Sequence, residues 1–272
     1  MNNLYRELAP ISDAAWAQID AEAARTLRRY LAARRVVDVA VPAGFALAAV
    51  GTGHVSPLAA PAEGVIARRR DTKAVVELRV PFVLDRQAID DVERGAADAD
   101  WQPAKDAARK LAFAEDGAIF DGYAAGDITG IRRGASNPAL TLPADARHYP
   151  EAVARAVEQL RQAGVDGPYA LVLGAVPYTA RAAASDRGYP VLRHIQRLVE
   201  AEIVWAAALD GGVVLSTRGG DFDLRLGQDI SIGYLSHTDA AVQLYLQESF
   251  TFLLQTPEAA VALAPAPTSG AG

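Results

Sequence analysis

The stretch that most constrains this chain lies near its C-terminus, at residues 211–234. It reads GGVVLSTRGGDFDLRLGQDISIGY, in which short apolar segments alternate with Gly-Gly, Gly-Asp and Gly-Gln dipeptides. Glycine favours tight turns and alternating apolar residues favour half-buried strands, so this stretch predicts short strands joined by turns. It contains no set of side chains suited to catalysis. We therefore expect a sheet here rather than an active site.

The composition is that of a globular protein with an ample core. The chain has 272 residues, of which 51% are hydrophobic and 22% charged, enough for one large domain or two modest ones. It has no cysteine, which excludes disulfides, thiolate metal sites and a cysteine nucleophile and suits the reducing cytoplasm. The N-terminus lacks an apolar signal segment, and no apolar run approaches the length of a membrane span. A net charge of −6 argues against a nucleic-acid coat.

Periodicity predicts a mixture of helices and strands without a regular βαβ rhythm, which indicates the α+β class. An amphipathic helix is expected over residues 12–33, with Ser12 as its N-cap. Further helices are expected over 88–95, 103–115, 150–163, 178–184 and 190–198, and strands over 65–70, 74–80, 169–173, 242–246 and 250–254. The strand at 74–80 places Val76, Leu78 and Val80 on one face. Residues 265–272 are expected to be disordered.

Each group of polar residues that could suggest chemistry has a simpler interpretation. The four histidines are far apart in sequence, and the Gly219–Asp221 and Gly227–Asp229 segments lack the spacing of phosphate-binding loops, so we interpret them as β-turns. Glu115, Asp116 and Asp121 could bind a divalent cation, but a solvated helix end is the favoured interpretation. We therefore predict no enzyme activity and no metal site.

Two basic clusters remain. We interpret Arg25, Arg28 and Arg29 as the solvated face of the first helix. Arg68, Arg69 and Arg70 are equally consistent with ion pairs between subunits and with contacts to nucleic acid.

Several segments, taken in order, resemble one family. These are LAPISDAAWAQID and AARRVVDV near the start, residues 211–234, and ESFTFLLQTPEAAV near the end. Together they resemble the encapsulins, bacterial nanocompartment shell proteins with the HK97-type fold of tailed-phage major capsid proteins. The resemblance runs over residues 4–263.

The resemblance implies a domain organisation that periodicity alone does not give. It implies an N-terminal helix and arm at 1–43 and an E-loop at 44–80. A discontinuous P-domain is expected at 81–125 with 226–264, an A-domain at 126–225, and a disordered tail at 265–272.

The resemblance also implies three functional surfaces. A C-terminal targeting peptide of an enclosed cargo protein would bind along Tyr30, Arg34, Val37, Asp38, Ile230 and Ile232. For Val37 and Ile230, a plain core contact is an equally good interpretation. Ser185, Asp186, Arg187, Gly188 and Tyr189 would line a pore. Val76, Leu78 and Val80 in the E-loop would contact a neighbouring subunit.

The implied function is self-assembly into an icosahedral homo-oligomer, with sixty copies favoured by the short chain. The cargo would be a dye-decolourising peroxidase or, as the next candidate, a ferritin-like protein. Some relatives carry a tryptophan that stacks on a flavin. This chain has Gln87 in that segment, so we expect no flavin or other cofactor. A phage or prophage-derived major capsid protein is the alternative.

Overall fold

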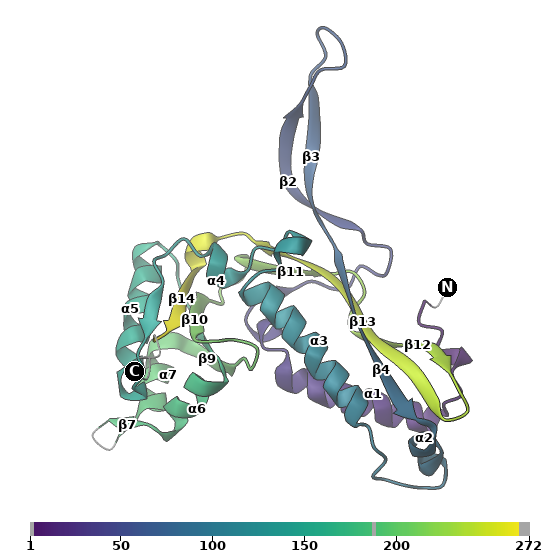
Figure 1. The fold of residues 1–272 in the computed structure, drawn as a ribbon. Coiled ribbons are helices and arrows are strands. Elements are labelled where there is room, and N and C mark those ends of the chain that lie inside the picture. Colours follow the sequence, from purple (N-terminus) through teal and green to yellow (C-terminus); the bar gives the residue numbers. More distant parts are fainter. Residues whose placement is uncertain (1–2, 187–188, 267–272) are drawn as a thin grey trace, which may run out of the picture.

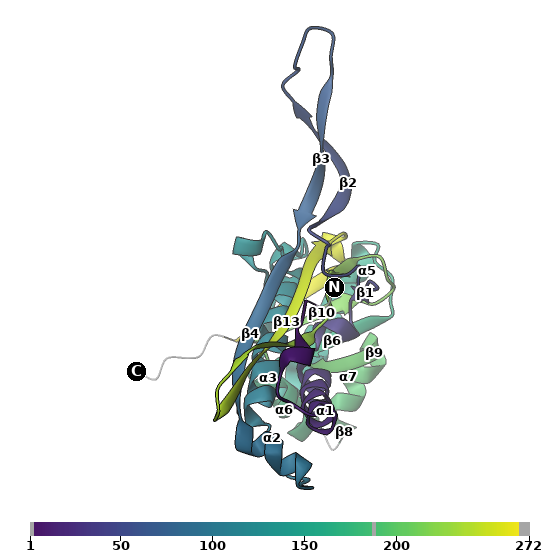
Figure 2. The same ribbon diagram turned by 90° about the vertical axis from the view of Figure 1, so that its right-hand side faces the viewer.

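The computed structural model describes residues 3–186 and 189–266 and contains two sheets with a hairpin that projects away from both (Figure 1). The hairpin consists of β2 (Ala49–Leu58) and β3 (Ala67–Ala74). Figure 2 shows that it remains extended when the molecule is turned by 90°. The rest of the chain folds around the two sheets.

The first sheet is built around the long strand β13 (Ala241–Leu254). Antiparallel β4 (Val76–Asp85) runs along one side of it, with Phe82 opposite Leu244. On its other side lie β12 (Ser231–His237) and β11 (Phe222–Leu226), and the short β1 (Asp38–Val39) pairs in parallel with β11. Each part of β13 is therefore paired on at least one side.

Helices α1 (Asp13–Tyr30), α2 (Arg86–Glu93) and α3 (Gln102–Phe120) pack on this sheet. Their apolar faces share one core with strand residues, including Ile19, Leu111, Leu84 and Leu244. The short helix η1 (Arg6–Leu8) precedes α1, and Leu4 accepts a hydrogen bond from the Tyr234 amide of β12. The N-terminal segment thus lies along the outer edge of the sheet.

The second sheet has the order β5 (Leu140–Leu142), β14 (Ala260–Pro265), β10 (Gly212–Ser216), β6 (Tyr169–Leu173), β9 (Glu200–Trp205). All residues of β6 and β10 are buried, which fits their continuous apolar sequence. Helices α5 (Tyr149–Gln162) and α7 (Val191–Val199) pack with this sheet in a single core. That core extends to Phe222, Phe250 and Phe252 of the first sheet, so the two sheets share it.

Shorter elements complete the described chain. They are η2 (Ala33–Arg35), η3 (Ala124–Gly126), α4 (Ile131–Gly134), η4 (Ala146–His148), α6 (Ala175–Ala183), β7 (Ser185–Asp186), β8 (Tyr189–Pro190) and η5 (Pro257–Ala259).

The structure confirms the main helical expectations. The Ser12 hydroxyl accepts a hydrogen bond of 3.2 Å from the Ala15 amide, as an N-cap does. Proline stands in the first turn of both α3 and α5. Helix α1 ends at Tyr30, before the expected residue 33, because the Asp116 carboxylate accepts hydrogen bonds from the Ala32 and Ala33 amides.

The strand expectations need three corrections. The hairpin partner of β3 is β2, in a stretch whose glycines and proline conceal its strand character, and β4 leaves the hairpin to pair with β13. The strands expected at 242–246 and 250–254 form the single strand β13, since Gln247, Glu248 and Ser249 are also buried in it. The tail was expected to start at residue 265, but β14 includes Pro265; residues 267–272 lie outside the described part.

The expected domain boundaries stay a prediction, and two strands lie in a different sheet from the other strands of their expected segment. Strand β14, expected in the P-domain, belongs to the second sheet through its antiparallel pairing with β10. Strand β11, expected almost entirely in the A-domain, belongs to the first sheet through β13. The chain therefore crosses between the two sheets once more than the segment boundaries imply.

Candidate functional surfaces

The hairpin has no core of its own. No residue of β2 or β3 is buried, although Lys73 near the base of the hairpin pairs with Asp127 at 2.7 Å. Apolar side chains are nevertheless exposed on it and in its connecting loop: Val55, Leu58, Val65 and Ile66, the last at 83%. A two-stranded hairpin without an apolar cover is marginally stable in water. The exposed apolar residues of this hairpin therefore form a candidate contact surface for another subunit.

Val76, Leu78 and Val80, which we expected at the same interface, lie instead at the base of the hairpin. They belong to β4, whose backbone pairs with β13. All three are half-buried and pack against the cores of their own chain. Much of their cover therefore comes from within the subunit, and the surface left for a neighbour lies further out on β2 and β3.

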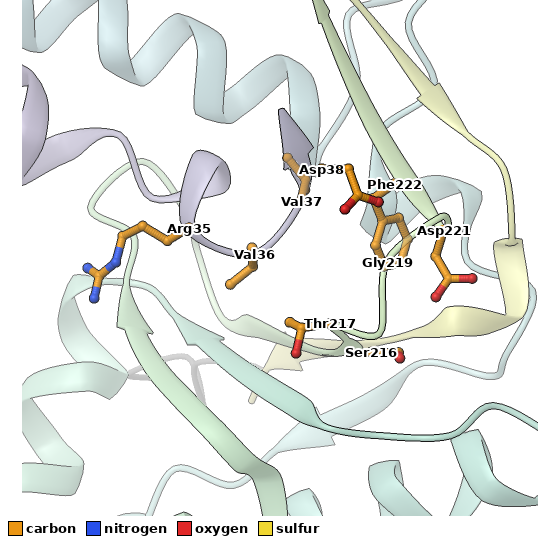
Figure 3. Close-up of a pocket in the computed structure, with 9 residues that line it drawn as sticks. All are labelled: Arg35, Val36, Val37, Asp38, Ser216, Thr217, Gly219, Asp221 and Phe222. Carbon is orange, nitrogen blue, oxygen red and sulfur yellow. The ribbon is translucent and has the colours of Figure 1, made fainter. Parts of the chain in front are cut away.

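Two of the six residues expected to bind cargo share a small crevice. Val37 and Asp38 line a cavity of about 120 Å³ together with Ser216, Thr217 and Phe222 (Figure 3). The Asp38 carboxylate accepts a hydrogen bond of 2.6 Å from the Gly220 amide. Gly219 and Gly220 both have positive φ, which gives this turn the shape that presents the amide to Asp38. The crevice offers the Asp38 carboxylate beside an apolar wall, while the hydroxyl groups of Ser216 and Thr217 already donate to backbone carbonyls.

Arg34 is committed to carboxylates of its own chain. Its guanidinium contacts Glu115 at 2.5 Å, Asp229 at 2.7 Å and Glu248 at 3.2 Å, and its side chain is only 17% exposed. Burial alone would lower the pKa of Arg34, but the hydrogen bonds with Glu115 and Asp229 raise it above its ordinary value. Arg34 therefore fixes the arm after α1 to α3 and β13.

The acidic pair on α3 is buried, so our interpretation of a solvated helix end was wrong. Glu115 and Asp116 are both fully shielded from solvent. Burial raises the pKa of Asp116 to about 7, against the opposing effect of the amides that donate to it. Burial and the neighbouring Glu115 carboxylate raise the pKa of Glu248 well above its usual range. This cluster, which sequence reasoning missed, joins three distant parts of the chain.

The other expected cargo residues are spread around this cluster rather than in one groove. Tyr30 packs against Phe113 and Trp205, with ring centroids 5.6 and 5.5 Å apart. Ile230 is half-buried against the core beneath α1, and Ile232, 4% exposed, belongs to that core. The crevice lined by Val37 and Asp38 contains none of these side chains.

The expected pore segment is described only in part. Ser185 and Asp186 pair with Pro190 and Tyr189 in the small β7–β8 ribbon, and the Ser185 side chain is exposed. Arg187 and Gly188 lie outside the described residues. The short β7–β8 ribbon follows the end of α6 and leads into α7.

Residues 3–186 and 189–266 contain neither a metal-binding cluster nor a membrane-spanning helix. No group of three or more histidine or acidic side chains there could hold a metal ion. No helix in this part of the chain is long and apolar enough to cross a membrane.

The fold defines a class of protein. A virus-like particle from Pyrococcus furiosus superposes with a TM-score of 0.67 at 12% identity, covering 91% of this chain and 98% of that one. Mycobacterium phage Bobi gives a TM-score of 0.56 at 14% identity, covering 89% and 91% of the two chains. The chain thus has the HK97-type fold of capsid proteins, as the resemblance implied.

Sequence comparison then identifies the family. A family model described as "Encapsulating protein for peroxidase" matches residues 1–251. The type 1 encapsulin shell protein of Rhodococcus erythropolis is 59% identical over 97% of this chain and 100% of its own length. The corresponding protein of Mycobacterium tuberculosis is 58% identical over 97% and 99%. The chain belongs to the encapsulin shell proteins, and this distinguishes it from the phage capsid alternative.

Proposed function

We infer that this chain assembles into a closed icosahedral shell in the cytoplasm and encloses a cargo protein. The observation that carries the inference is the hairpin, which exposes apolar side chains and buries none of its residues. In a protein with a capsid fold, a neighbouring subunit would cover such an element and remove its free strand edges. Repetition of this contact under closed symmetry gives a shell, for which we favour sixty copies.

Deletion of residues 55–72 tests this inference. The deletion removes the outer hairpin but leaves β4 and both cores in place. We expect soluble oligomers smaller than a shell, because obligate contacts of this kind bury about 2,000–5,000 Å². Light scattering and negative-stain microscopy would measure the product. Intact shells from the deleted chain would contradict the role given to the hairpin.

We infer further that the shell holds its cargo by a C-terminal peptide and has no catalytic activity itself. The Val37–Asp38 crevice is the best candidate for the binding site, because it combines an exposed carboxylate with an apolar wall. A single peptide should bind weakly, so an oligomeric cargo with several tails would gain by avidity. The family description names a peroxidase, which favours a dye-decolourising peroxidase over a ferritin-like cargo.

Loading of a co-expressed peroxidase bearing its own tail tests the crevice. Asp38→Ala should reduce the amount of peroxidase retained in purified shells, whereas Asp210→Ala, at another exposed carboxylate, should not. Ile230→Asp is a better probe of the β12 side than Ile232→Asp, since Ile232 lies in the core and its substitution would disturb folding. Unchanged loading in Asp38→Ala shells would exclude the crevice.

We propose that the segment between α6 and α7, which includes the β7–β8 ribbon, lines a pore in the shell. Ser185, Asp186, Arg187, Gly188 and Tyr189 would line an opening in the shell, and the opposite charges of Asp186 and Arg187 predict weak charge selectivity. Equal uptake rates for small anions and small cations would support this, and a strong bias toward either would contradict it.

A further inference from the structure

The stretch that links β1 to β2 is apolar and yet lies on the surface. Residues 39–50 read VAVPAGFALAAV and contain no charged side chain. Residues 41–46 of this stretch are all exposed, with Val41 at 88% and Phe45 at 57%. We call residues 41–46 the apolar segment. A contiguous exposed apolar surface of this kind is typical of a contact with another molecule.

Backbone hydrogen bonds hold the apolar segment in place. The Ala43 amide donates to the Leu226 carbonyl at 3.0 Å, and the Gly44 amide donates to the Gly227 carbonyl at 2.8 Å. Gly44 has a φ of 97°, a conformation that favours glycine. The segment is therefore attached to the end of β11, and its apolar side chains stay in solvent rather than folding over a core of their own chain.

The outer end of the hairpin carries a second exposed apolar surface. Residues 57–66 are all exposed, and Glu63 is the single charged residue among them. Leu58, Val65 and Ile66 are exposed at 51%, 46% and 83%. We call these three residues the tip residues. Their surface matches that of the apolar segment in chemistry.

The tip residues of a chain cannot reach the apolar segment of the same chain. Strand β2, with its 10 residues, separates the two surfaces by about 30 Å of extended backbone. Strand β3 pairs with β2 along this length and keeps the hairpin extended. Figures 1 and 2 both show the end of the hairpin far from the rest of the chain. Only another molecule can therefore cover either surface.

A second copy of this chain fits both surfaces better than a different partner does. Each copy has one set of tip residues and one apolar segment, so the two surfaces are present in equal number in any assembly. Under closed symmetry each copy gives one such contact and receives one, which leaves neither surface in water. A different molecule would have to be present in the same number as the shell chain to achieve this.

We propose that Leu58, Val65 and Ile66 of one copy dock on residues 41–46 of a second copy. This rests on the proposed function and deepens it, because it names the surface of the neighbouring subunit that the hairpin contacts. Removal of the apolar side chains of both surfaces from water stabilises the contact.

Cross-linking through introduced cysteines tests the contact, since the chain has no cysteine of its own. Val41→Cys/Ile66→Cys and Phe45→Cys/Val65→Cys are prepared as full chains, assembled with reductant and then oxidised. A disulfide needs Cα atoms about 4.4–6.8 Å apart, so a bond between these positions joins two copies. Val41→Cys/Val176→Cys is the matched control, because Val176 is 81% exposed and lies on α6. Non-reducing electrophoresis of shells of native mass measures the fraction of linked chains.

We expect at least one of the two pairs to link about tenfold more chains than the control pair, since only neighbouring Cα atoms are bridged. Each single-cysteine chain should stay unlinked. Shells of native mass in which neither pair exceeds the control would overturn this contact and leave the shell function intact. Linking of the Val41→Cys chain alone would also overturn it, because the apolar segment would then face its own counterpart instead of the tip residues.

A pair of opposite charges decides the question where the cysteine chains fail to assemble. Ile66→Asp and Val41→Lys should each reduce shell formation, measured by light scattering. The chain with both substitutions should recover much of the loss, because the two charges then meet across the contact. Ile66→Asp/Val176→Lys should recover none. Equal assembly of the two double variants would overturn the contact, whereas failure of the native chain to form shells would refute the proposed function.

Discussion

The β2–β3 hairpin and the buried acidic cluster stabilise the molecule in opposite ways. The hairpin buries none of its residues and leaves apolar side chains such as Ile66 in solvent. The cluster buries Glu115, Asp116 and Glu248 completely and pairs them with Arg34 and two backbone amides, which leaves only Oε1 of Glu248 in the cluster without a hydrogen-bond partner. The contacts of the cluster lie within a single chain, whereas we propose that a second copy covers the hairpin. On this proposal, burial within one chain distinguishes the parts of the subunit that fold alone from the part that is covered on assembly.

The largest expected effect comes from removing the one cation of the cluster. Arg34→Met leaves Glu115 and Glu248 buried without their partner, and the loss of one member of a buried pair costs about 3–5 kcal/mol. Thermal unfolding at one fixed protein concentration would measure it, since assembly links stability to concentration. Adding Glu115→Gln and Glu248→Gln to Arg34→Met should restore part of the loss. A variant as stable as the native chain would show that the cluster contributes little.

A more gradual effect, spread over several pH units, should appear in the pH dependence of unfolding. Because burial raises the pKa of Asp116 from 3.8 to about 7, the folded chain holds this proton more tightly than the unfolded chain. The resulting stability is fully present below pH 3.8 and is lost as the pH rises through about 7, by up to about 1.4 kcal/mol per pH unit. Asp116→Asn removes this titration. The free energy of unfolding of the native chain and of Asp116→Asn, measured between pH 3.8 and 7, should follow different curves. Parallel curves would show that Asp116 does not titrate as stated.

A substitution in the loop at the hairpin tip should have the smallest effect on the stability of the folded subunit. Its effect on shell formation should be much larger. Ile66→Asp changes a side chain that touches little of its own chain, so the stability of the subunit should change by less than about 0.5 kcal/mol. Shell formation should nevertheless fall sharply, because a charge would have to be buried at the contact. Glu63→Gln, at an exposed residue in the same loop, serves as control. If Ile66→Asp still forms normal shells, Ile66 does not contribute to the contact between subunits.

Local signals predicted the helices well. Ser12 before an apolar stripe, and prolines at the starts of α3 and α5, act within a few residues and need no tertiary contact. The burial of Glu115 also had a sequence signal, since it lies four residues from both Leu111 and Ile119 on one helix face. That spacing indicates burial but does not identify the partner.

Long-range contacts could not be predicted in this way. Arg34 and Glu248 are 214 residues apart in sequence, and only the fold brings them together. Strand β2 was missed because Gly51, Gly53 and Pro57 lower its strand propensity, and its partner is an arginine-rich strand without apolar alternation. Sequence alone also could not predict the surroundings of the expected cargo residues. Arg34 pairs with the buried Glu115, and Ile232 belongs to a hydrophobic core.

The most direct test of the account is the mass and shape of the purified chain, with and without residues 55–72. We predict hollow particles for the intact chain, with a mass of about 1,700 kDa for sixty copies of 28.7 kDa. The deleted chain should give only small, folded oligomers. A monomer or small oligomer from the intact chain would contradict the central claim that a neighbouring copy completes the hairpin.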